Sequence, residues 1–188
     1  MYNLKEMLKH LNEELTQNLI LDGTKIQWYN DRIKKWKDGN KIAPVTIDIA
    51  LTRSCNYGCH FCYAMTQEND RSVIKKDHIF SFLDDAAEIG VKGISLVSDG
   101  ESTVSPIFVD TIERGSKNGI SMATATNGFL LNEDKLNKIL PNLTYLRFNI
   151  SAGEAKRYAE IMGCKESWFD RVVKNIKLAV DIKKKKNL

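Results

Sequence analysis

The sequence predicts an α/β fold in which parallel strands alternate with helices. Four short segments, 45–51, 93–97, 120–125 and 144–150, show the alternation or the continuous apolar character of strands. Each of them is followed by a segment in which apolar residues recur with a helical period. Strand followed by helix, repeated in this way, is typical of a parallel sheet with right-handed helical crossovers.

Helices are therefore expected at about 77–89, after Pro106, between Asn132 and Pro141, at 154–161 and at 167–184. Asp77 and Ser105 are the predicted N-caps of the first two helices, with Pro106 at the first helical position of the second. Asn132 is the predicted cap of the third helix, which Pro141 should end.

Residues 1–42 are expected to form a helical N-terminal extension, and residues 43–188 a core domain. Apolar residues with a helical period run from Leu4 to Leu19, and a second short helix is expected over 27–37. We expect the leucine stripe of the first helix to pack against the core domain, not to enter a membrane.

Composition excludes several classes of protein. The chain has 188 residues, of which 43% are hydrophobic and 28% charged, and this is the composition of a globular domain. No apolar run approaches the ~20 residues of a transmembrane helix, and the first residues lack the apolar region of a signal peptide. With a net charge of only +4, a nucleic-acid partner is not expected. We expect a cytoplasmic protein with no membrane partner.

Three cysteines stand together in the loop after the first strand. Cys55, Cys59 and Cys62 have the spacing CxxxCxxC, and thiolates are the protein ligands of iron–sulfur clusters. Cys164 is remote in sequence and is expected to be a free, partly buried residue, which would leave one iron of a four-iron cluster without a protein ligand. A zinc site that adds His60 to the three thiolates is the alternative.

The segment CNYGCHFCY, residues 55–63, resembles the signature of the radical S-adenosylmethionine (radical SAM) superfamily. In that superfamily the loop binds a [4Fe–4S] cluster, and SAM chelates the fourth iron through its amino group and carboxylate. Three later segments add to the resemblance. Residues 98–101 resemble the GGE motif, 126–128 the common TNG segment, and 147–151 the fourth-strand region. Asp99 departs from the pattern, because it replaces the first glycine of GGE.

The resemblance implies that the site lies where loops follow the carboxyl ends of the strands. It implies that Glu101 accepts from the SAM ammonium, that Thr126 and Asn127 donate to the carboxylate, and that the Tyr63 region meets the adenine. Asn149 or Ser151 is expected at the ribose or carboxylate. The full set of expected cofactor-binding residues is Phe61, Tyr63, Asp99, Gly100, Glu101, Thr126, Asn127, Asn149 and Ser151.

The resemblance also implies a reaction. The reduced cluster cleaves SAM to methionine and a 5′-deoxyadenosyl radical, which removes a hydrogen atom from a substrate. A flavodoxin or ferredoxin is the expected electron donor. A peptide or protein side chain is the first expected substrate class, ahead of small metabolites and RNA. The alternatives are a non-catalytic iron–sulfur fragment or subunit that needs a partner chain, and a zinc-binding interaction module.

The length of the chain raises one further expectation. The core of this superfamily is a partial (βα) barrel, and residues 43–188 hold about four βα units of the usual six. The fourth strand would then be an open edge of the sheet. Four explanations are open: a fragment, a truncated gene, a split protein completed by a second chain, or self-association that covers this edge.

Overall fold

The computed structural model describes residues 24–188, and the helix expected over 3–20 lies outside this range. The chain divides between Ala43 and Pro44 into two compact units. The described part of the first unit holds a 3-10 helix, η1 (Thr24–Tyr29), and the helix α2 (Asn30–Lys37). The short helix expected over 27–37 is therefore present as two consecutive elements.

The second unit is built on one sheet of four parallel strands, as the sequence predicts. The strands are β1 (Thr46–Asp48), β2 (Gly93–Leu96), β3 (Ser121–Thr126) and β4 (Leu143–Phe148), in the order β1-β2-β3-β4. Ile47 pairs with Ile94, and Leu96 pairs with Thr124. Because consecutive strands are neighbours, the loops at their carboxyl ends follow one another along one edge of the sheet.

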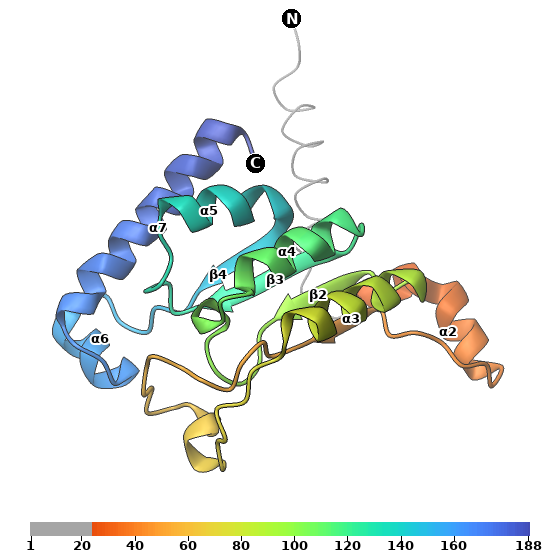
Figure 1. Cartoon of the computed structure of the whole chain (residues 1–188), viewed down its shortest axis with the longest axis horizontal. Helices are drawn as coiled ribbons and strands as arrows, with labels where there is room; N and C mark the ends of the chain where they lie inside the picture. Colours follow the sequence, from red (N-terminus) through yellow and green to blue (C-terminus); the bar gives the residue numbers. More distant parts are fainter. Residues whose placement is uncertain (1–23) are drawn as a thin grey trace, which may run out of the picture. The chain divides into compact units, whose positions relative to one another are not determined.

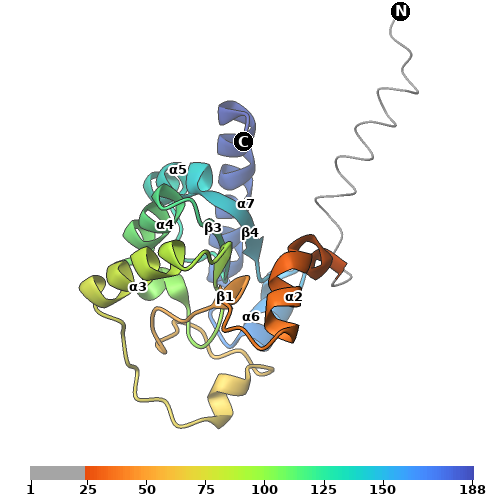
Figure 2. The same ribbon diagram turned by 90° about the vertical axis from the view of Figure 1, so that its right-hand side faces the viewer.

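Helices connect the strands and cover one face of this sheet (Figures 1 and 2). The connecting helices are α3 (Lys76–Glu88), α4 (Phe108–Lys117) and α5 (Glu133–Ile139), and the helices α6 (Ala155–Met162) and α7 (Ser167–Lys186) follow β4. Short 3-10 turns, η2 (Tyr63–Thr66), η3 (Ser102–Val104) and η4 (Leu140–Asn142), lie in the connections. Within residues 24–188, no helix is long and apolar enough to cross a bilayer.

The main core lies between the sheet and these helices. Ile94, Leu96 and Met122 point from the strands into it and are at most 1% exposed. They meet Leu83 of α3 and Ile112 of α4, both fully buried. Each such buried side chain contributes about 1.5–3 kcal/mol to the stability of the fold. The core therefore holds the strands in register and fixes the edge at which the loops emerge.

Two predicted helix starts are wrong. Helix α3 begins at Lys76 with Lys75 as its N-cap, two residues before the predicted cap Asp77. Asp77 therefore lies inside the first turn, where its negative charge interacts favourably with the helix dipole. Helix α4 begins at Phe108 because Ser105 ends the 3-10 turn η3 and its carbonyl accepts from the Phe108 N–H. Asn132 caps α5 as predicted, since its Oδ1 accepts from Lys135 N at 2.9 Å.

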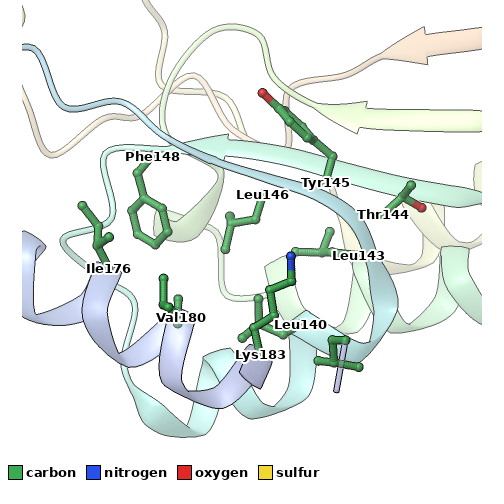
Figure 3. A pocket seen from close by; sticks show the side chains of 11 residues that line it. Leu140, Leu143, Thr144, Tyr145, Leu146, Phe148, Ile176, Val180 and Lys183 are labelled. Carbon is green, nitrogen blue, oxygen red and sulfur yellow. The ribbon is translucent and has the colours of Figure 1, made fainter. Parts of the chain in front are cut away.

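Strand β4 ends the sheet on one side, and a groove runs beside it. Figure 3 shows Leu146 and Phe148 of β4 opposite Ile176 and Val180 of α7, with Lys183 further along α7 beside Leu143. The groove has a volume of about 300 Å³ and a largely apolar lining. The predicted open edge is thus present in the described chain, and it lies beside apolar side chains.

Candidate functional site

The loop that carries the three cysteines leaves the carboxyl end of β1. An isolated bridge between Thr52 and Val73 closes the long connection from β1 to α3 at its base. Within the loop, Cys62 N donates to Cys59 O at 3.0 Å, and Tyr57 N donates to Cys55 Sγ at 3.4 Å. The thiols are therefore presented by a turn with its own hydrogen bonds.

The three thiols are close enough to affect one another. Burial, together with the smaller effects of the neighbouring Cys55 and Cys62, raises the pKa of Cys59 to about 11. Burial also raises the pKa of Cys55. A metal or cluster must hold these sulfurs as thiolates against that tendency, so cofactor binding and proton release are coupled here.

Across residues 24–188, no three His, Cys, Asp or Glu side chains converge on a point where one metal ion would bind. The zinc alternative needs such a convergence of Cys55, Cys59, Cys62 and His60. Thiolates are the protein ligands of iron–sulfur clusters, so the donor set of three cysteines fits such a cluster.

Gly100 holds the start of the cysteine loop against the end of β2. Its φ is +72°, which favours glycine, and a Cβ at this position would lie 2.7 Å from the Ser54 carbonyl oxygen and would also collide with that of Thr52. The next residue, Glu101, donates its backbone N–H to Ser54 O at 2.9 Å. Only glycine at position 100 lets the two backbones approach this closely.

The Glu101 carboxylate joins the ends of β2 and β3 and is only 5% exposed. Its Oε1 accepts from Thr103 N at 3.1 Å, from Thr103 Oγ1 at 2.7 Å and from Thr126 Oγ1 at 2.7 Å. Its Oε2 accepts from Asn127 N at 2.8 Å. Four donors from the chain itself balance this buried charge, so the carboxylate positions Thr126 and Asn127 beside the cysteine loop.

Asn127 continues this network into the loop. Its Nδ2 donates to Asn56 Oδ1 at 2.9 Å, and Asn56 directly follows the first cysteine. Thr126 Oγ1 also accepts from Gly128 N at 3.0 Å. The structure therefore brings the predicted residues Gly100, Glu101, Thr126 and Asn127 together with the cysteine loop in one connected set.

Asp99, the departure from the GGE pattern, is paired within the chain. Its Oδ2 lies 3.4 Å from Arg53 Nε, and its side chain is 22% exposed. A hydrogen bond to Asp99 raises the pKa of Tyr63, which lies on the first turn after the cysteines. Arg53 thus offsets part of the extra negative charge that Asp99 brings to this edge of the sheet.

The remaining predicted residues lie at the rim. Phe61 and Tyr63 are 65% and 57% exposed. Asn149 follows β4, where its backbone N–H donates to Thr126 O at 2.8 Å and its Oδ1 accepts from Arg147 Nε at 3.2 Å. Ser151 is exposed two residues further on. These side chains are exposed and do not belong to the buried network.

The sequence analysis missed the aromatic group behind the cysteine loop. Tyr57 packs against the stacked rings of Phe129 and Trp168, with its ring centroid 5.2 Å from that of Trp168, and its hydroxyl lies 3.1 Å from that of Tyr158. Cys59 and Cys164 pack against this group. Tyr57 stands inside the quoted motif, but only the fold shows that its partners come from α6 and α7.

Gly163 also holds the loop from behind. It ends α6 with a φ of +58°, and a Cβ there would collide with the Gly58 carbonyl. The neighbouring Ile161 carbonyl accepts from His60 N at 3.0 Å. The cysteine loop is therefore fixed from two sides, by the Glu101 network and by the end of α6.

The protein is a parallel α/β domain that carries a cysteine loop at the carboxyl ends of its strands. The radical SAM superfamily model matches residues 49–187, so the chain belongs to the radical SAM superfamily. This confirms the resemblance seen in the cysteine motif.

Relatives and solved structures agree with this assignment. The chain is 30% identical over 136 residues to a "Probable GTP 3′,8-cyclase" of Saccharolobus solfataricus, covering 71% of this chain and 43% of that protein. Streptococcus suis SuiB bound to S-adenosylmethionine has a similar fold, with a TM-score of 0.65 and 22% identity over 95% of this chain and 42% of SuiB. SuiB bound to its precursor peptide SuiA matches equally well, with a TM-score of 0.65 and 20% identity. The chain thus spans less than half the length of these proteins.

Proposed function

We propose that this chain carries the cluster- and SAM-binding part of a radical SAM enzyme. Cys55, Cys59 and Cys62 hold a [4Fe–4S] cluster, and SAM binds at the remaining iron. The observation that carries the proposal is the direct connection of the cysteine loop to Glu101 and Asn127 at the ends of β2 and β3. When bound, the reduced cluster supplies the electron that cleaves SAM to methionine and a 5′-deoxyadenosyl radical, which takes a hydrogen atom from the substrate.

The chain's own residues position the cofactors. The buried Glu101 carboxylate fixes Thr126 and Asn127, and through Asn127 it fixes the loop beside Cys55. Oε2 of Glu101 accepts a single hydrogen bond from the described residues, so we propose this oxygen as the acceptor for the SAM ammonium. The exposed rings of Phe61 and Tyr63 provide apolar surface for the adenine. Asn149 and Ser151 remain the proposed contacts to the ribose or carboxylate.

A peptide or protein side chain is the substrate class we propose first, because SuiB, which shares this fold, has been crystallised with its precursor peptide. A nucleotide is the second class, because the curated relatives are named GTP 3′,8-cyclases. A small flavodoxin or ferredoxin is the proposed electron donor. A second polypeptide or a second copy along β4 remains the proposed way to complete the barrel.

Electron paramagnetic resonance of the anaerobically reconstituted, dithionite-reduced protein tests the cofactor assignment. We expect a [4Fe–4S]⁺ signal that changes when SAM is added, together with about four irons per chain for this cluster type. Cys59→Ala should lose the cluster, whereas Cys164→Ala, which removes the one cysteine outside the motif, should retain it. A full cluster in Cys59→Ala contradicts the ligand assignment, and zinc in place of iron supports the zinc-binding module.

Product analysis separates the enzyme from a non-catalytic subunit. The reduced protein should release 5′-deoxyadenosine from SAM, slowly without substrate and faster with the right one. A cluster that responds to SAM but never cleaves it would indicate a fragment or subunit that needs a partner chain.

A further inference from the structure

The side-chain amide of Asn56 has a donor that the protein does not use. Its Nδ2 is buried, and no group among the described residues accepts a hydrogen bond from it. Buried donors are rarely left without a partner in a native protein, and those that are often face an ion or ligand. Asn56 lies directly beside Cys55, at the point where the proposed cluster meets the protein.

The hydrogen-bond network determines which end of the Asn56 amide is unused. Phe129 N donates to Asn127 Oδ1 at 3.0 Å, so the other end of the Asn127 amide must be its NH₂ group. That NH₂ group donates to the neighbouring Asn56 oxygen at 2.9 Å. The Asn56 oxygen is therefore turned toward Asn127, and its NH₂ group is turned away from Asn127.

The same network makes the position of this donor rigid. Asn127 is 4% exposed, and its backbone N–H is bound to the buried Glu101 carboxylate. The Asn56 amide is thus the last member of a chain of hydrogen bonds that starts at a buried charge and ends in the cysteine loop. Because the donor is already oriented, little side-chain entropy is lost when an acceptor reaches it.

We propose that Asn56 donates a hydrogen bond from Nδ2 to a negatively charged acceptor of the bound cofactors. The acceptor is a sulfur of the cluster or the carboxylate of SAM, both of which carry the electron density that an amide N–H stabilises. This inference rests on the proposed function, because it requires the cluster and SAM at this loop. Hydrogen bonds to cluster sulfurs are among the factors that set reduction potentials.

Two variants and one matched control test the proposal. Asn56→Asp keeps the size of the side chain and an oxygen for Asn127 but replaces the donor with an acceptor. Asn56→Leu removes the donor without adding charge. Asn137→Asp makes the same chemical change on α5, where the amide donates to the Glu133 carbonyl at 3.0 Å. Iron content, the midpoint potential without SAM and the dissociation constant of SAM are measured for each reconstituted protein.

The two sources of the acceptor give different results. If the acceptor is a cluster sulfur, Asn56→Leu should lower the ratio of reduced to oxidised cluster about tenfold at the wild-type midpoint, which corresponds to about 59 mV for one electron. If the acceptor is the SAM carboxylate, the potential without SAM should stay unchanged while SAM binds about tenfold more weakly. Asn137→Asp should match the wild type in every measurement.

Other outcomes overturn the inference. Wild-type iron content, potential and SAM affinity in both Asn56 variants would show that the donor meets neither cofactor. If a variant fails to hold iron, urea unfolding of the metal-free Asn56→Asp protein decides the matter. An unchanged urea concentration at half-unfolding supports a role of Asn56 toward the cofactor. A lowered one shows that Asn56 has a structural role. Failure of the wild-type protein to bind a cluster would instead overturn the proposed function.

Discussion

The hydroxyl oxygens of Tyr57 and Tyr158 lie 3.1 Å apart inside the protein, although 101 positions separate the two residues in the sequence. Tyr57 belongs to the cysteine loop, and Tyr158 is a fully buried residue of α6. Burial raises the pKa of both phenols, so both remain neutral at physiological pH. This contact ties the loop that carries the proposed cluster ligands to the C-terminal pair of helices.

Tyr158→Phe should destabilise the metal-free protein by about 1–2 kcal/mol, because the Tyr57 hydroxyl loses its buried partner. Urea unfolding followed by Trp fluorescence measures the change. Tyr145→Phe removes the same atom from a ring that is 55% exposed and should leave stability within about 0.5 kcal/mol of the wild type. Equal effects of the two substitutions would show that the buried hydrogen bond contributes nothing.

Gly163→Ala should lower the stability of the protein by more than the cost of placing alanine at a positive φ. Gly119 has a φ of +77° and open space around it, whereas Gly163 has a φ of +58° and contacts the Gly58 carbonyl. Gly119→Ala should lower stability by about 1–2 kcal/mol through its backbone conformation. Gly163→Ala should add about 1–3 kcal/mol of steric strain and reduce the iron bound after reconstitution.

Both glycine variants are compared by urea unfolding and iron analysis. Gly119→Ala should bind iron like the wild type, because Gly119 follows α4 and does not contact the loop. Equal loss of stability in the two variants, with full iron in both, would rule out a role of the close approach in holding the loop.

Glu101→Gln should destabilise the metal-free protein by about 2–3 kcal/mol. The carboxylate accepts four hydrogen bonds from the chain, and an amide would turn one NH₂ group toward these donors. Glu113→Gln, at an exposed position of α4, is the control and should have little effect. A Glu101→Gln protein as stable as that control would mean that water or rearrangement satisfies the same donors.

The reactivity of Cys59 should report its raised pKa. In the folded, metal-free protein, alkylation by iodoacetamide should follow a midpoint near pH 11, whereas in the urea-unfolded chain it should follow the ordinary value near 9. Because the folded state favours the neutral thiol, this group stabilises the metal-free fold below pH 9, and its contribution disappears as the pH rises toward 11. Peptide mass spectrometry at several pH values measures the rate at this residue.

A midpoint of alkylation near pH 9 in the folded protein would show that Cys59 is well solvated before the cluster binds.

Cluster assembly should also be favoured by higher pH, because three thiols must lose their protons. The iron bound at a fixed time should therefore rise between pH 7 and pH 9 in the wild type.

The sequence was sufficient to predict the parallel α/β fold, because strand and helix periodicities repeat without long interruptions. It also predicted the four strand segments and the Asn132 cap, which depend on local pattern. The starts of α3 and α4 were missed because nearby residues compete for the same role. Lys75, with its extended backbone, is the N-cap of α3 in place of the expected Asp77. Ser105 ends the 3-10 turn η3 and does not cap α4.

The candidate site was predictable only where a short motif carried it. The cysteines, Gly100, Glu101, Thr126 and Asn127 follow strand ends and are recognisable in order along the chain. The contacts that join Tyr57 to Tyr158, or Gly58 to Gly163, connect segments about a hundred residues apart. Nothing in the local pattern of either segment specifies the other, so these partners emerge only from the packing of α6 and α7 on the loop.

The support that Tyr158 and Gly163 give to the cysteine loop has a consequence for the order of events during synthesis. When residues 55–62 leave the ribosome, the surfaces that fix them have not yet been made, because α6 and α7 follow them in the chain. The nascent chain therefore exposes three cysteines on an unsupported loop. Iron–sulfur assembly factors should therefore load the loop only after α6 and α7 have been synthesised and have packed behind it.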